Sequence, residues 1–208
     1  MPPMSTPSSP VAPTLYQQLL GAPFFTLPDA VRLLHSNRGR LRCAGRASIQ
    51  GGAGPLARLC ARFAGLPRAA ADVPLTVDFV ADGGAEHWQR DFGGMRMASR
   101  LQARNGRLVE RRGPLQFRFA LHVNDGMVFW NTVGVRLFGL LPLPARLFEG
   151  VRCRERANGE RYEFLVEAVL PLLGRVVRYE GWLLPADVDA PADPPVPESA
   201  IMGASPQE

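Results

Sequence analysis

Two glutamates, Glu110 and Glu155, are the residues of this sequence best placed to do chemistry, because turn geometry predicts that both point into the core. One lies just after the Asn-Gly pair at 105–106 and the other just before the pair at 158–159. Each pair is typical of a two-residue type I′ hairpin loop, which fixes the hairpin register and therefore which side chains share a face. Two buried carboxylates near each other have raised pKa values and can act as an acid–base pair.

At residues 105–106 the register places Arg104 opposite Arg107 and Leu101 opposite Glu110. The face that contains Glu110 is otherwise apolar, with Leu108 next to it along the strand. Because side chains alternate between faces, a slip of one residue would turn this glutamate outward. We therefore expect Glu110 on the concave face of the sheet.

At residues 158–159 the same geometry places Ala157 opposite Glu160 and Glu155 opposite Tyr162. The other face of this hairpin is rich in arginine and glutamate and is expected to face water. The face shared with Glu155 is apolar and is formed by Val151, Cys153, Tyr162, Phe164 and Val166.

An arginine is also expected inside, since Arg90 shares a strand face with Trp88 and Phe92. A buried charge without a partner costs several kcal/mol, so these groups should be paired, solvated or bound to a ligand. We predict that each glutamate lies within reach of an arginine, with Arg90 as the candidate. Two interpretations stay open: an ion pair that only closes the fold, or a ligand pocket.

The histidines and cysteines of the sequence indicate neither a metal site nor a disulfide framework. They are His35, His87 and His122, together with Cys43, Cys60 and Cys153. The cysteines form no CxxC pair, and His35 is expected at a helix C-terminus, where the helix dipole favours it. The absence of lysine excludes a P-loop. We expect no metal and no cofactor.

The charge of the chain favours an anionic partner. All 24 basic residues are arginine, and five of the 19 acidic residues follow Pro185, so the rest of the chain carries 24 positive and 14 negative side chains, a net charge of +10. Alternatively, these arginines are solvated and balance an acidic tail. No specific nucleic-acid binding is expected, because Phe117 and Phe119 around Arg118 belong to one buried strand face.

The pattern of apolar residues predicts an α+β fold, with N-terminal helices packed on a strongly curved antiparallel β-meander that forms a barrel or half-barrel. Helices are expected at 15–20, capped by Thr14, at 27–36, capped by Thr26, and from Pro55 to Gly65, with Leu56, Leu59, Cys60 and Phe63 on one apolar stripe. The expected strands are 40–50, 74–81, 86–92, 96–104, 107–112, 115–123, 127–138, 151–157, 160–170 and 175–184.

Two kinds of segment lie outside this pattern. Residues 1–13 and 186–208 are rich in Pro, Ser, Ala and Asp and are expected to be disordered tails of a single domain at 14–185. The segment 135–148 is the most apolar stretch, and Pro142 and Pro144 exclude a regular helix or central strand there. It could be a lid, a membrane-contacting tip or a buried crossover.

The sequence resembles the bacterial "domain of unknown function 4166" family over residues 15–184. The resemblance rests on WQRDFGG at 88–94, SRL at 99–101, ERRGPL at 110–115, LPLP at 141–144, Glu155 and GRVVRYEGWL at 174–183. The resemblance implies relatives that stand alone or follow a reductase domain similar to saccharopine dehydrogenase. This sequence contains no such domain and no Rossmann fingerprint.

The favoured function is non-catalytic binding of a small amphipathic or anionic ligand in the concave face. The residues expected to line or gate the cavity are Trp88, Arg90, Glu110, Glu155, Tyr162, Tyr179 and Trp182. One alternative is an enzyme that uses Glu110 and Glu155 as acid and base. Another is a peripheral membrane or protein-interaction module that uses the 135–148 loop. Without a signal peptide or a long apolar run, the expected location is the cytoplasm.

Overall fold

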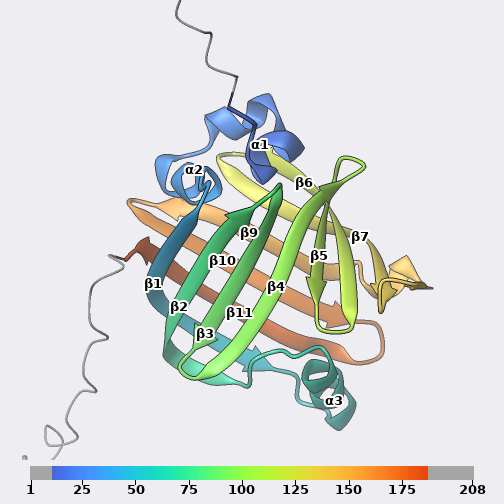
Figure 1. The fold of residues 1–208 in the computed structure, drawn as a ribbon. Coiled ribbons are helices and arrows are strands. Elements are labelled where there is room, and N and C mark those ends of the chain that lie inside the picture. The colour runs from blue at the N-terminus through green and yellow to red at the C-terminus, as the bar shows by residue number, and fades with distance from the viewer. Residues whose placement is uncertain (1–10, 187–208) are drawn as a thin grey trace, which may run out of the picture.

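Ten antiparallel strands close into a barrel in this computed structural model, which describes residues 11–186 (Figure 1). The predicted tails lie mostly outside the described residues. The barrel dominates the fold, and only short helices accompany it. The strands of the ring are β1 (Arg40–Gly51), β2 (Ala70–Asp82), β3 (Ala85–Phe92), β4 (Met95–Arg104), β5 (Arg107–Arg112), β6 (Leu115–Asn124), β7 (Met127–Leu137), β9 (Gly150–Asn158), β10 (Arg161–Leu170) and β11 (Gly174–Pro185).

The strands follow one another around the ring as a meander. Neighbouring strands are ordered β6-β5-β4-β3-β2-β1-β11-β10-β9-β7, and a pairing between β6 and β7 completes the ring. Closure removes the free sheet edges that an open half-barrel would leave. Where β1 meets β11 the two backbones lie close together, because a Cβ added to Gly181 would lie 2.2 Å from the Arg46 carbonyl oxygen.

The first Asn-Gly hairpin has the predicted register. Asn105 and Gly106 have φ angles of 51° and 66°, as a type I′ turn requires, and Leu101 lies opposite Glu110. The side chain of Glu110 is buried, at 6% exposure. The turn therefore directs this glutamate into the barrel.

The second hairpin differs from the prediction by two residues. Asn158 stays in the strand opposite Arg161, where its amide donates a hydrogen bond of 2.7 Å to Glu163, so Gly159 and Glu160 form the loop. Glu155 consequently lies opposite Phe164 rather than Tyr162. A shift of two residues preserves the alternation of faces, and Glu155 still points inward.

One end of the barrel, which we call the closed end, is covered by N-terminal helices (Figure 1). They are α1 (Leu15–Leu20), the 3-10 helix η1 (Ala22–Thr26) and α2 (Asp29–His35). Thr14 caps α1 as predicted, in a capping box with Gln17. The prediction that Thr26 caps α2 is wrong: Thr26 ends η1, its hydroxyl donates to the Pro23 carbonyl, and α2 begins after Pro28.

The opposite end, the open end, carries α3 (Pro55–Phe63), which lies beside β1 and β11. The sequence predicted an apolar stripe on one face of this helix. Three of its members, Leu56, Leu59 and Phe63, are 61%, 62% and 54% exposed, and Ala57 is the helix residue that is buried. The helix packs on the wall through the small side chain of Ala57, and its large apolar side chains stay exposed.

The apolar segment 135–148 forms a flap at the same end. It contains the edge strand β8 (Leu141–Leu143), which pairs with β7, and the 3-10 helix η2 (Ala145–Leu147). The prolines keep β8 short and at an edge, because proline cannot donate to a sheet. Phe138 and Leu140 are 69% and 83% exposed, so the segment is not a buried crossover.

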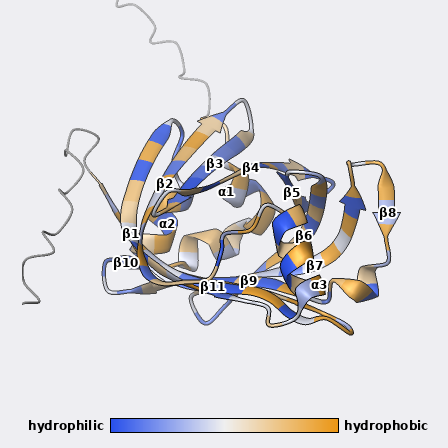
Figure 2. Cartoon of the chain, turned by 90° about the horizontal axis from the view of Figure 1, so that it is seen from below, coloured by the Kyte–Doolittle hydropathy of each residue, from blue (hydrophilic) through white to orange (hydrophobic). Residues whose placement is uncertain are grey.

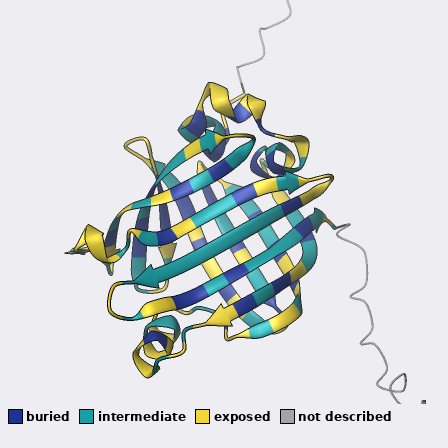
Figure 3. Cartoon of the chain, turned by 180° about the vertical axis from the view of Figure 1, so that it is seen from behind, coloured by how far each residue is buried: buried dark blue, intermediate teal, exposed yellow. Residues whose placement is uncertain are grey.

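Along the barrel wall, buried residues alternate with less buried ones, as Figure 3 shows from behind. The inward side chains and the faces of α1 and α2 that cover the closed end form one hydrophobic core. Between residues 11 and 186, none of the helices combines the length and the apolar character needed to cross a membrane.

Candidate functional site

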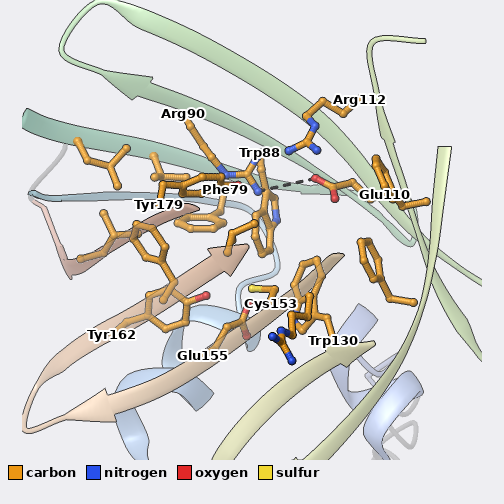
Figure 4. A pocket seen from close by; sticks show the side chains of 18 of the residues that line it. Phe79, Trp88, Arg90, Glu110, Arg112, Trp130, Cys153, Glu155, Tyr162 and Tyr179 are labelled. Carbon is orange, nitrogen blue, oxygen red and sulfur yellow. Dashed lines mark ion pairs between the residues drawn. The ribbon is translucent and has the colours of Figure 1, made fainter. Parts of the chain in front are cut away.

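Most of the residues predicted for the site line one inner chamber of the barrel, with a volume of about 60 Å³. The six residues that the structure brings together there are Trp88, Arg90, Glu110, Glu155, Tyr162 and Tyr179. Figure 4 shows Glu110 on one side of the chamber with Arg90 and Arg112. Glu155 lies on the other side, beside Cys153 and Tyr162.

Trp182 is the exception, and its prediction as a cavity residue is wrong. On β11 the inward positions are Tyr179 and Leu183, so the side chain of Trp182 lies on the outer face. There the guanidinium of Arg161 lies 4.3 Å from the centre of its ring. The contact is a cation–π interaction on the barrel surface.

Glu110 has the predicted arginine partner. The guanidinium of Arg90 lies 4.0 Å from the Glu110 carboxylate, and both side chains are largely buried. Arg90 also donates a hydrogen bond of 2.9 Å to the Ser99 hydroxyl and lies 4.8 Å from the centre of the Trp88 ring. Three contacts from β3, β4 and β5 thus fix the position of this arginine.

Glu155 has a different partner from the one predicted. Its carboxylate lies 2.8 Å from Nε2 of His35, and the two side chains are 1% and 0% exposed. The imidazole stacks on Tyr16 with ring centres 3.5 Å apart. An arginine was the wrong expectation because α2 inserts its own histidine into the closed end. The signal was present in the sequence, since His35 lies four residues after Val31 on the apolar face of its helix.

A third carboxylate, Glu86, also points into the barrel and was missed. It lies two residues before Trp88 on β3, so strand alternation could have identified it. Its carboxylate accepts a hydrogen bond of 2.8 Å from the Trp88 indole. Burial raises the pKa of Glu86, although the charge of His35 and the indole hydrogen bond oppose the shift.

The inner chamber holds no activated nucleophile among the described residues. Burial, followed by the negative charge of Glu155, raises the pKa of Cys153 well above its ordinary value, and the same two causes raise the pKa of Tyr162. Both groups therefore stay protonated at neutral pH. Glu110 and Glu155 each have a partner of their own, the Arg90 guanidinium and the His35 imidazole.

A larger outer chamber of about 510 Å³ lies at the open end, between α3 and the flap. Its lining is almost entirely apolar and includes Leu59, Phe63, Leu115, Leu143, Phe148 and Val177. The two chambers share the lining residues Arg112, Phe117, Val151 and Val166. The inner chamber, which contains the charged side chains of the site, thus continues toward the open end into a chamber that is almost entirely apolar.

Arg112 lies where the two chambers meet. Its guanidinium donates a weak hydrogen bond to Met97 Sδ at 3.7 Å and lies 5.6 Å from the centre of the Phe117 ring. Its Nε is buried without a hydrogen-bond partner. Arg90, the other arginine whose side chain points into the inner chamber, has a glutamate 4.0 Å away, whereas Arg112 has no carboxylate within 4.0 Å in residues 11–186.

No group of three or more His, Cys, Asp or Glu side chains in the described part of the chain is arranged to hold a metal ion. The charged groups inside the barrel are instead the guanidinium groups of Arg90 and Arg112 and the carboxyl groups of Glu86, Glu110 and Glu155.

Comparisons with known proteins place the chain in a sequence family. The model of the family described as "Domain of unknown function (DUF4166)" matches residues 27–183. No curated protein matches the sequence. Among solved structures, the crystal structure of Rv2717c from M. tuberculosis is similar at a TM-score of 0.40 and 11% sequence identity, over 77% of this chain and 99% of that chain.

Proposed function

Because the chain belongs to the DUF4166 family, whose description assigns no activity, we propose a function from the barrel itself: it binds an amphipathic organic anion in its interior. The ligand has an apolar body in the outer chamber and one carboxylate, or a similar monoanionic group, at Arg112.

The position of Arg112 is the observation that carries this proposal. A guanidinium that is partly buried and has no acidic partner is costly to maintain, and an anion that enters the barrel would supply the missing charge and hydrogen bonds. Arg90 and Glu110 already balance each other, and Glu155 has His35. One uncompensated cation favours a ligand with a single negative charge.

The shapes of the two chambers support an amphipathic ligand. The outer chamber is large and apolar, so the burial of a hydrocarbon body would contribute roughly 25 cal/mol for each Å² removed from water. The inner chamber has room for little more than a head group or ordered water. A fully polar metabolite would leave the apolar lining of the outer chamber uncovered.

Catalysis by Glu110 and Glu155 is the alternative function. It would require the two carboxylates to act on one substrate inside the inner chamber, which measures about 60 Å³ and lies behind Arg112. The separate partners of the glutamates favour binding over acid–base chemistry. A substrate that disappears during incubation with the protein would instead favour the enzyme.

Fluorescence titration tests the proposal. Anilinonaphthalene sulfonate, an apolar dye with one negative charge, should bind the protein, and decanoate should displace it while decanol does so more weakly. Arg112→Met should raise the Kd for decanoate about tenfold to a hundredfold, the worth of one hydrogen-bonded charge contact.

Arg100→Met is the matched control, because Arg100 is exposed on the outer face of β4 and takes no part in either chamber. Its affinity for decanoate should equal that of the wild type. Equal binding of decanoate and decanol, or an unchanged Kd in the Arg112→Met variant, would contradict the proposed function.

A further inference from the structure

Large apolar side chains gather uncovered around the open end of the barrel. Twelve large apolar side chains are exposed among the described residues, and eight of them belong to α3, the flap and the loop between β10 and β11. We call these eight the apolar rim: Leu56, Leu59, Phe63, Phe138, Leu140, Leu141, Leu147 and Leu172.

The apolar rim is formed by three segments that are far apart in the sequence. α3, the flap and the β10–β11 loop all leave the barrel wall at the same end, as strand directions require. Seen from below, α3 and β8 lie on the same side of the barrel, and both show apolar residues in orange (Figure 2). Leu140 and Leu172 are 83% and 106% exposed, so they project from the surface. Large exposed apolar side chains that gather at one end of a molecule in this way typically mark a binding site.

The charge of the connections also differs between the two ends. The open-end connections, residues 52–69, 93–94, 113–114, 138–149 and 171–173, contain four arginines and one glutamate, a net charge of +3. The closed-end segments, residues 11–39, 83–84, 105–106, 125–126 and 159–160, contain two arginines and three acidic residues, a net charge of −1. Among the connecting segments, the net positive charge therefore lies at the same end as the apolar rim.

We propose that the open end docks on the surface of an anionic phospholipid bilayer. The apolar rim inserts among the acyl chains, while Arg58, Arg62 and Arg146 contact the lipid head groups. These three arginines are exposed and make no ion pair within the described chain. Two copies of this chain that met rim to rim would bring two positive surfaces together, so charge favours the bilayer over a dimer.

Docking in this orientation turns the outer chamber toward the membrane. The rim residues Leu59 and Phe63 also line that chamber, so the surface and the cavity are continuous. An amphipathic anion could then pass between the bilayer and the barrel without crossing bulk water. Membrane binding itself does not require Arg112 or a bound ligand.

Vesicle cosedimentation tests the docking. The wild-type protein should sediment with vesicles of phosphatidylglycerol and phosphatidylcholine in equal parts, at least about tenfold more strongly than with phosphatidylcholine alone. High salt, about 0.5 M, should reverse most of this difference because it screens surface charge. Replacement of Arg58, Arg62 or Arg146 by Gln should weaken the partition about fivefold for each arginine.

Leu140→Asp should weaken the partition about tenfold or more, because it puts a negative charge on the most exposed part of the flap. Leu33→Asp is the matched control, since Leu33 is 57% exposed but belongs to α2 at the closed end, and it should sediment as the wild type does.

Three outcomes would overturn the docking proposal: equal binding to both kinds of vesicle, equal loss for Leu140→Asp and Leu33→Asp, or a dimer in solution that Leu140→Asp dissociates. The Arg112→Met variant separates this proposal from the ligand proposal. It should sediment like the wild type even though it binds decanoate weakly, and its loss of sedimentation would contradict a docking surface independent of the cavity.

Discussion

The two ends of the barrel differ in which side chains they bury and which they leave exposed. At the closed end, the buried carboxylates have partners, as in the contacts of Glu155 with His35 and of Glu86 with Trp88. At the open end, apolar side chains such as Leu59 and Phe63 are left exposed around an apolar chamber. Residues that break the ordinary rules of burial without local compensation are expected at functional sites. The difference therefore assigns stability to the closed end and binding to the open end.

The largest effect is expected from breaking the buried pair at the closed end. His35→Leu removes the partner of the Glu155 carboxylate and should lower the free energy of unfolding by about 3–5 kcal/mol. Urea denaturation followed by circular dichroism measures this change. Arg152→Gln is the control, because it breaks the 3.3 Å pair with Glu167 on the outer wall and should cost about 1 kcal/mol or less. A cost below that of the control would show that the pair is not structural.

The pH dependence of the free energy of unfolding tests the closed end a second time, through the buried carboxyl group of Glu86. Burial raises the pKa of this carboxyl above its ordinary value of 4.5, so the folded state holds the proton more tightly than the unfolded state does. The contribution of Glu86 to stability is thus fully present below pH 4.5 and is lost as the pH rises through its folded pKa. Glu86→Gln should flatten this decline while keeping the Trp88 hydrogen bond. Identical pH profiles for the variant and the wild type would contradict the raised pKa.

Leu140→Ser should have the smallest effect on stability. The side chain is 83% exposed, so its removal should change the free energy of unfolding by no more than about 0.5 kcal/mol. The matched change at the closed end, Leu34→Ser, removes a side chain that is 5% exposed and should cost several times more. Similar costs for the two variants would mean that the open end is packed more tightly than its exposure indicates.

The barrel and its inward glutamates could be predicted because they depend on local rules. Alternation along strands and two-residue turns determine which way Glu110 and Glu155 point, even though the second hairpin is shifted by two residues. The partner of Glu155 could not be found in this way, because His35 comes from a helix whose docking is a tertiary event. Strand alternation alone could also have placed Trp182 on the outer face, because Tyr179 and Leu183 point inward and Trp182 is adjacent to Leu183.

The open end could not be predicted from periodicity. The stripe of Leu56, Leu59 and Phe63 has the spacing of a helix that packs on a core, and the same spacing serves a helix that borders a chamber. Spacing says which side chains share a face, whereas the partner of that face depends on how far the helix stands from the wall. The outer chamber and the position of Arg112 between the chambers follow from that distance.

The most direct test of this division of roles measures decanoate affinity and the free energy of unfolding on the same preparations of the wild type and Arg112→Met. Arg112 lacks a carboxylate partner, so its replacement should change the free energy of unfolding by no more than about 1 kcal/mol while raising the Kd at least about tenfold. An unchanged Kd would contradict the account. So would a loss of stability as large as that expected for His35→Leu, because Arg112 would then belong to the structural part of the barrel.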